Sequence, residues 1–102
     1  MSAIPEYEAL VPRALESLIP TFLAQRRKDL EQLQQALEAG DFARLASLGH
    51  RMRGSSTSYG FPHIASLGRR IELEAKAGER SSLMRIVDEY RAFLANVRIR
   101  LA

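Results

Sequence analysis

The sequence contains no cysteine and no tryptophan, and its 102 residues include only four prolines. Without cysteine the chain can form no disulfide, thiol nucleophile or thiolate metal site, and this is typical of a cytosolic protein. No run of about 18 apolar residues is present, and the N-terminal segment MSAIPEYEAL has acidic residues where a signal peptide is basic and then apolar. We therefore expect a cytoplasmic protein with no membrane association.

The composition that remains is that of an ordinary globular domain. Hydrophobic residues make up 46% and charged residues 26% of the chain, which is long enough for one modest core. We expect residues 1–102 to form a single domain. The net charge of +3 is modest and the arginines are spread along the chain, so the basic footprint of a nucleic-acid-binding protein is weak.

Apolar residues recur at steps of three and four in four segments, which predicts four helices. The segments run over residues 12–39, 42–59, 62–77 and from Leu83 to Leu101, the last following a Ser81-Ser82 cap. Gly40 and Asp41 predict a tight turn between the first two helices, and Gly60 and Gly78 predict the ends of the next two.

These signals favour an all-α, antiparallel four-helix bundle with a short N-terminal helix across one end. Pro20 lies within the first long segment, where we expect it to kink the helix rather than break it. No segment shows a sustained alternation with a period of two, so no strand is predicted.

The direction of each side chain on the second helix singles out His50. At about 100° per residue, four apolar side chains fall roughly 160° to 220° away from the histidine, namely Leu45, Leu48, Met52 and Tyr59. This apolar cluster must face the core, so His50 is expected to face solvent.

Small residues line the side of the helix that carries His50. Within about 60° of it lie one arginine and five small residues, namely Arg53, Ala43, Ala46, Ser47, Gly54 and Thr57. A glycine inside a helix costs about 1 kcal/mol relative to alanine, so Gly54 indicates that a partner approaches the backbone there. At neutral pH an ordinary imidazole is mostly the free base and can act as a nucleophile, while a nearby guanidinium suits an anion such as a phosphoryl group.

The motif HRMRGSS, which begins at His50, and Gly60 ten residues after the histidine resemble the signature of histidine-containing phosphotransfer (HPt) domains, H-x-L-K-G with a second glycine. The flanking stretches LEQLQQALEAGDFARLASLGH and FPHIASLGRRIELEAKAG are similar to the family's helices. The resemblance covers most of the chain from about Pro12 onward.

Three positions depart from the family pattern. Arg53 replaces the usual lysine and Met52 the usual leucine, and both changes are conservative. Gly49 stands where alanine is more common, and it either loosens the helix or permits close helix packing.

The resemblance implies that His50 accepts a phosphoryl group from a receiver-domain aspartate and passes it to another receiver aspartate. Arg53 would stabilise the phosphoryl oxygens, and Gly54 would leave clearance for docking. The residues expected to contact the partner are Ala46, Ser47, Arg51 and Thr57.

The implied partners are response-regulator receiver domains and a hybrid sensor histidine kinase. Magnesium would be bound by the receiver, because no cluster of carboxylates surrounds the histidine in this sequence. The chain also lacks a phosphate-binding glycine loop, so we expect no cofactor, no metal site and no ATP-dependent kinase activity of its own. A monomer is expected because the chain has a single buried apolar seam, which runs along the last helix from Leu83 to Leu101.

Two alternatives stay open. The chain could be a helical adaptor that binds receiver or kinase domains without transfer, or a small basic DNA-binding bundle, although helix-turn-helix spacing is missing. For His63, which follows Pro62, a surface structural role is favoured over a zinc site shared with His50, because no third ligand lies near.

Overall fold

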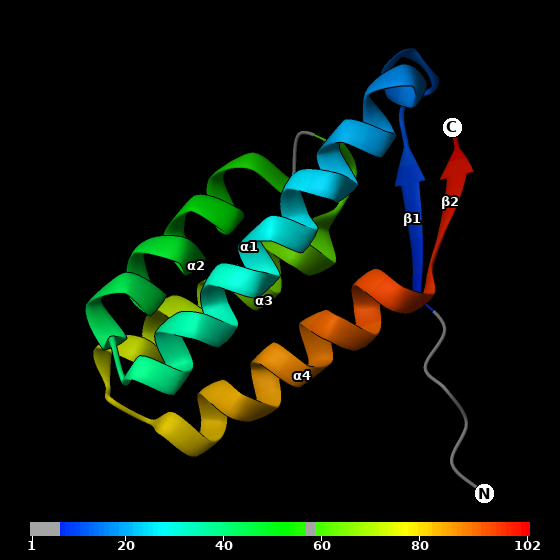
Figure 1. Ribbon diagram of the computed structural model, residues 1–102. Helices are drawn as coiled ribbons and strands as arrows, with labels where there is room; N and C mark the ends of the chain where they lie inside the picture. Colours follow the sequence, from blue (N-terminus) through cyan, green and yellow to red (C-terminus); the bar gives the residue numbers. More distant parts are fainter. Residues whose placement is uncertain (1–6, 57–58) are drawn as a thin grey trace, which may run out of the picture.

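The computed structural model describes residues 7–56 and 59–102. Four α-helices make up most of it, α1 (Ile19–Ala39), α2 (Phe42–Ser56), α3 (Pro62–Lys76) and α4 (Arg80–Asn96). A 3-10 helix, η1 (Arg13–Leu18), precedes α1, and two strands, β1 (Tyr7–Val11) and β2 (Val97–Leu101), lie together at one end of the bundle (Figure 1). The prediction of a mostly helical protein with four helices is confirmed.

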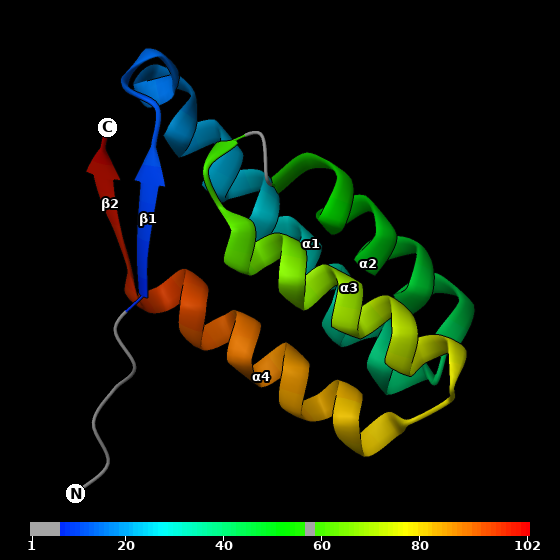
Figure 2. The same ribbon diagram turned by 180° about the vertical axis from the view of Figure 1, so that it is seen from behind.

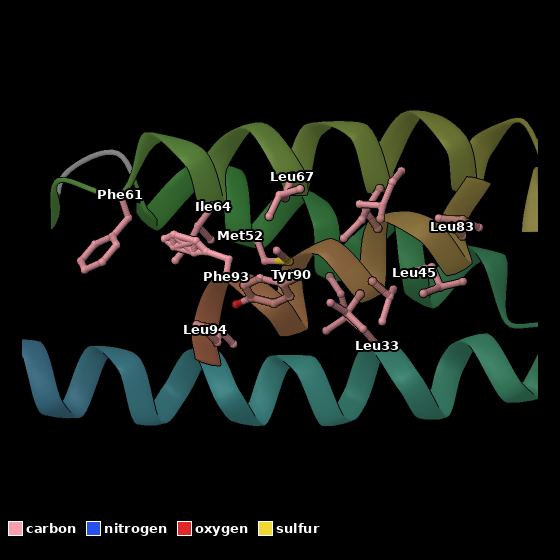
Figure 3. Close-up of a cluster of buried hydrophobic side chains, with 14 of the residues drawn as sticks. Leu33, Leu45, Met52, Phe61, Ile64, Leu67, Leu83, Tyr90, Phe93 and Leu94 are labelled. Atoms are coloured by element: carbon pink, nitrogen blue, oxygen red, sulfur yellow. The ribbon is translucent and has the colours of Figure 1, made fainter. Parts of the chain in front are cut away.

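The core lies between the helices, and each helix buries one apolar stripe. Figure 3 shows side chains from all four helices meeting there, including Leu33, Leu45, Met52, Leu67 and Tyr90, which are completely buried. Apolar residues at steps of three and four are buried on the last two helices, namely Ile64, Leu67, Ile71 and Ala75 of α3 and Leu83, Val87, Tyr90 and Leu94 of α4. The most extensive helix contact joins α2 to α3, and it positions the candidate site.

The turn between α1 and α2 follows the sequence signals. Gly40 ends α1 in the left-handed conformation with φ 66°, which glycine adopts at little cost. The carboxylate of Asp41 then accepts a hydrogen bond of 3.0 Å from the backbone N–H of Arg44, as expected of an N-cap. This turn brings α2 against α1 over the core.

Residues 7–11 form a strand rather than part of the predicted short N-terminal helix, whose first six residues lie outside the described ones. β1 pairs in parallel with β2, with Tyr7 opposite Val97 and Val11 opposite Leu101, and the two strands lie side by side in both views (Figures 1 and 2). Ala9 and Val11 face inward and are buried. The backbone hydrogen bonds of this segment are made with β2, near the far end of the chain, instead of within a local helix.

The last helix is shorter than predicted for the same reason. It begins at Arg80, with Glu79 rather than a serine at its N-cap, and ends at Asn96, where Val97 adopts an extended conformation. Val97 and Leu101, predicted as part of the helical seam, lie on β2 and are half-buried. The alternation in VRIRL therefore belongs to a strand.

Pro20 does not interrupt a long helix. The α-helix begins at Ile19, so Pro20 lies in its first turn, where the missing N–H has no intrahelical partner to lose. The preceding residues form η1 instead. The predicted start at residue 12 and the kink are not confirmed; the helix type changes at Ile19.

The predicted end of the second helix also differs. α2 ends at Ser56, whereas Tyr59 and Gly60 belong to the connection that leads to α3. Gly60 has φ 84°, and a Cβ added there would lie 2.4 Å from the carbonyl oxygen of Leu10. Glycine is therefore required where β1 passes over this connection.

Candidate functional site

α2 presents His50 to solvent, as its helical position predicts. Leu45, Leu48 and Met52 are buried on the opposite side of the helix, while the His50 side chain is 64% exposed. The three apolar residues fix the rotation of α2 about its axis, so the direction of the histidine follows from core packing.

A carboxylate from α3 lies against the histidine. Oε2 of Glu72 is 3.3 Å from Nδ1 of His50, and Nη2 of Arg53 is 3.2 Å from the same nitrogen. Arg53 also reaches Glu72, with 3.6 Å between Nη1 and Oε1. His50, Arg53 and Glu72 therefore form one contact cluster across α2 and α3.

Lys76 completes the electrostatic surroundings of Glu72, with its Nζ 3.3 Å from Oε2. Partial burial raises the pKa of Glu72, but the hydrogen bond and charge of Lys76 and the charges of Arg53 and His50 outweigh this effect. The pKa of Glu72 therefore lies below its ordinary value, and the side chain is a carboxylate at neutral pH.

Two glycines bring the two helices close enough for this contact. A Cβ on Gly49 would lie 2.6 Å from the carbonyl oxygen of Gly68, and a Cβ on Gly68 would lie 2.6 Å from that of Gly49. Both distances are far shorter than a normal van der Waals contact. Gly49 directly precedes His50 and Gly68 lies one turn before Glu72, so the glycine crossing sets the distance between these side chains.

The Hpt domain family matches residues 17–99 of the chain. The chain belongs to the Hpt domain family. It is also similar to Multistep phosphorelay regulator 1 of Schizosaccharomyces pombe (strain 972 / ATCC 24843), with 31% identity over 74 residues. The alignment covers 72% of this chain and 25% of the relative, so the chain spans about a quarter of that protein's length. No solved structure matches the chain significantly.

The departure of this Hpt chain at Gly49 now has a structural reason. Of the two possibilities that the sequence left open, close helix packing is the one found, because Gly49 contacts the α3 backbone. An alanine at residue 49 would place its Cβ 2.8 Å from the backbone nitrogen of Glu72. The glycine therefore permits a helix crossing that alanine would prevent.

The face of α2 around His50, which carries small residues, has room for a partner at Gly54. A Cβ on Gly54 would have no atom within 4 Å among the described residues beyond its own helix backbone and chain neighbours, so no packing against the rest of the described chain requires glycine there. Ser47 is exposed and Ala46 is half-buried against the core. Thr57, also predicted to contact the partner, lies outside the described residues.

Arg51 lies on the side of α2 that faces α1. Its Nη2 is 3.4 Å from Oδ1 of Asp29 and 3.3 Å from Oε1 of Gln32. Asp29 is buried and also pairs with Arg26, whose Nε is 3.0 Å from Oδ2. Arg51 thus joins α2 to a polar cluster on α1, although its side chain remains 59% exposed.

The sequence did not identify Glu72, Lys76 or Gly68 as site residues. Glu72 follows the buried residue Ile71 and looked like one of several charges on α3. Only the crossing of α2 and α3 places its carboxylate beside His50.

His63 is not a simple surface residue. Its ring lies 4.9 Å from the ring centroids of both Tyr7 and Phe93, so it packs in the layer between β1 and α4. No group of three or more histidine or acidic side chains in the described chain could hold a metal ion. Within residues 7–56 and 59–102, no helix is both long enough and apolar enough to cross a membrane.

Proposed function

We propose that the chain is a phosphorelay intermediate in which His50 accepts a phosphoryl group from a receiver-domain aspartate and passes it to another receiver aspartate. The carrying observation is the exposed imidazole of His50 on an uncrowded helix face, with the Arg53 guanidinium beside it, in a chain of the Hpt family. The printed name of the fungal relative, a multistep phosphorelay regulator, supports the same role.

The contacts of His50 favour Nε2 as the accepting atom. Arg53 and Glu72 both contact Nδ1, so the contacts of the ring with α2 and α3 side chains engage this nitrogen rather than Nε2. With two thirds of the side chain exposed, the Nε2 lone pair can reach a phosphorus atom held by a partner. Nucleophilic attack requires this kind of access.

Arg53 is placed to stabilise the transferred group. Its side chain is 46% exposed and one helical turn from His50, so rotation about its side-chain bonds can bring the guanidinium to the phosphoryl oxygens. Charge-assisted hydrogen bonds from arginine are well suited to these oxygens.

Gly54 and Ser47 leave room for the receiver to approach, with Ala46 at the base of the same face. Arg51 would contact the receiver at the edge of this surface, and the predicted contact of Thr57 lies outside the described residues. We assign the magnesium to the receiver, so this chain would bind no cofactor and would have no ATP-dependent kinase activity. We further propose that the chain is a cytoplasmic monomer and that a hybrid sensor histidine kinase is one of its partners.

The proposal is tested by incubating the chain with phosphorylated receiver domains from the same genome and measuring label on the chain. We expect wild-type protein to take up label and His50→Gln to take up none. His63→Gln is the matched control, because it removes the other histidine of the sequence, and it should still be labelled. If no receiver transfers label to the wild-type protein, the proposal is wrong.

The same experiment distinguishes transfer from the non-transferring adaptor that the sequence left open. The adaptor would bind receivers equally well as wild-type protein and as His50→Gln, with no labelled product from either. Binding and labelling measured on the same samples therefore separate the two functions.

A further inference from the structure

The strand β2 has an edge that no other strand of the described chain covers. Within residues 7–56 and 59–102 the sheet consists of β1 and β2, so each strand has one side without a strand partner. On β1 this side faces the connection from α2 to α3, because the carbonyl oxygen of Leu10 lies against Gly60. On β2 it faces outward, and Figures 1 and 2 show this strand outermost beside β1.

The hydrogen bonds between the strands show which backbone groups of β2 point outward. The backbone N–H of Ala102 donates to the carbonyl oxygen of Val11 over 2.9 Å, and Val11 lies opposite Leu101 in the parallel register. Backbone groups of successive residues in a strand point to opposite sides, so residues 98, 100 and 102 bond to β1. Ile99 and Leu101 therefore direct their N–H and C=O groups away from β1, where a further strand could bond to them.

An apolar groove lies beside the inward-facing side chains of β2. It has a volume of about 340 Å³, and its lining comes from η1, the start of α1 and β2, namely Glu16, Ile19, Pro20, Ile99 and Leu101. The two β2 side chains are half-buried, whereas Ala9 and Val11, which lie opposite them on β1, are buried. The apolar side of the strand pair is thus covered at β1 and partly open at β2.

The opposite face of the strand pair is basic. Arg98 and Arg100 alternate with the half-buried residues of β2 and are exposed, and the two strands carry one acidic residue, Glu8, against these two basic ones. Nη1 of Arg100 lies 3.1 Å from Oε1 of Glu8, with both side chains more than half exposed. An ion pair of this kind contributes less than about 1 kcal/mol, so Arg100 can exchange Glu8 for a carboxylate of a partner.

We propose that the open edge of β2 binds an extended acidic segment of a partner protein as a third strand. The acidic side chains would lie over Arg98 and Arg100, and the apolar side chains that alternate with them would enter the groove. In strand addition of this kind, main-chain hydrogen bonds supply affinity and the alternate side chains supply specificity. The proposal does not depend on phosphotransfer at His50, which lies on α2.

A second copy of this chain is a poorer match for the edge. Residues directly opposite one another in an antiparallel strand pair project to the same face. In the symmetric pairing of β2 with β2 that has the longest overlap, Arg98 of one copy therefore lies opposite Arg100 of the other. Like charges in this position destabilise the pair, whereas glutamate or aspartate in the added strand replaces the repulsion with attraction.

The open edge is tested first by amide hydrogen exchange of the complete chain without a partner, followed by NMR. The N–H of Arg100 points to β1, so it should exchange at least about fivefold more slowly than those of Ile99 and Leu101. Equal exchange at these residues would overturn the assignment of the outward groups. Protection of Ile99 and Leu101 that increases with protein concentration would assign the edge to a second copy and overturn the acidic partner.

Binding is then measured with three blocked peptides of equal length. The first alternates glutamate with valine, the second has lysine in place of every glutamate, and the third has serine in place of every valine. We expect the glutamate–valine peptide to bind and to slow exchange at Ile99 and Leu101 at least about fivefold. The lysine peptide lacks the charge match and the serine peptide lacks the groove contacts, so each should bind at least about fivefold more weakly.

Arg100→Glu separates charge recognition from general binding of peptides. It should weaken binding of the glutamate–valine peptide about fivefold and strengthen binding of the lysine peptide. Arg85→Glu is the matched control, because it reverses the same charge in the second turn of α4, whereas β2 follows the end of that helix. It should change neither affinity. Arg100→Gln serves as the second variant if circular dichroism shows that Arg100→Glu is unfolded, and it should weaken binding in the same direction.

The outcomes separate this proposal from the proposed function. A glutamate–valine peptide that does not bind, that binds no better than the lysine peptide, or that protects amides of α2 instead of β2 would overturn the inference. The arginines would then serve only to keep other strands away from this edge. Label transfer to His50 is measured separately, so failure of either proposal leaves the other standing.

Discussion

Gly68→Ala should destabilise the chain, although alanine is the better helix former. The new Cβ would lie 2.6 Å from the Gly49 carbonyl oxygen, 2.8 Å from Cβ of Met52 and 3.0 Å from the backbone nitrogen of Arg53. Two of these three neighbours are backbone atoms of α2 that cannot move aside alone. The two helices must therefore separate.

The magnitude follows from two opposing effects. Overpacking of a close contact typically costs about 1–3 kcal/mol, while replacing a helical glycine with alanine gains about 1 kcal/mol. Because three contacts are too short at once, we expect the cost of overpacking to exceed the gain in helix propensity. The free energy of unfolding should therefore fall by about 1–2 kcal/mol. The separation would also lengthen the 3.3 Å contact between His50 and Glu72.

Urea unfolding followed by circular dichroism measures this effect, and Gly54→Ala is the matched control. Among the described residues, the same chemical change at residue 54 meets no atom within 4 Å beyond its own helix backbone and chain neighbours, so it should raise the free energy of unfolding by about 0.5–1 kcal/mol. In the same protein it should slow transfer from a receiver, because the added methyl group lies on the docking face. A Gly68→Ala variant as stable as wild-type protein would refute the proposed tight crossing.

Two further predictions concern a hydrogen bond in the core and the stability of the fold at acidic pH. Tyr90→Phe removes the hydrogen bond of 3.2 Å from the buried hydroxyl to the carbonyl oxygen of Arg26, and should lower the free energy of unfolding in urea by about 1 kcal/mol. Burial, together with the charge of Asp29, raises the pKa of Tyr90, so the loss of stability should be the same at pH 6 and pH 8. An unchanged free energy of unfolding would contradict this hydrogen bond. Glu72 has a lowered pKa in the folded chain, so its charge stabilises the fold above its ordinary pKa of 4.5 and this contribution disappears as the pH falls through the lowered value. The stability difference between wild-type protein and Glu72→Gln should therefore shrink below pH 4.5, and a difference that grows in acid would show the opposite sign.

Local signals predicted the helical part of the fold and the direction of His50. The Gly40-Asp41 turn depends on residues next to each other in the sequence, and the apolar spacing of Leu45, Leu48 and Met52 fixes the buried side of α2. Such signals involve neighbours within one or two helical turns, so the sequence alone is enough to read them.

The strand pair could not be predicted in the same way. Tyr7 pairs with Val97, and no local pattern specifies a partner so far along the chain. The segment VRIRL does alternate apolar and basic residues, which is typical of a strand. Its Val97 and Leu101 also continued the helical spacing of the residues before them, and five residues are too few to decide between the two readings.

Glu72 was missed because its role depends on how two helices cross. The sequence placed it on a helix but gave no distance to His50, and that distance follows from the contact between Gly49 and Gly68. The glycine at residue 49 was a visible departure from the family pattern, whereas its partner at residue 68 carried no signal of its own. Tertiary packing thus supplied the acidic neighbour of the histidine.

In the proposed transfer His50 carries a phosphoryl group on Nε2, and this is tested by locating the phosphate after incubation with a phosphorylated receiver. We predict one acid-labile, alkali-stable phosphate per chain, a nitrogen-15 signal of His50 that shows phosphorus bonded to Nε2, and no phosphate on His50→Gln. Phosphate that survives acid, that lies on another residue, or that persists on His50→Gln would contradict it.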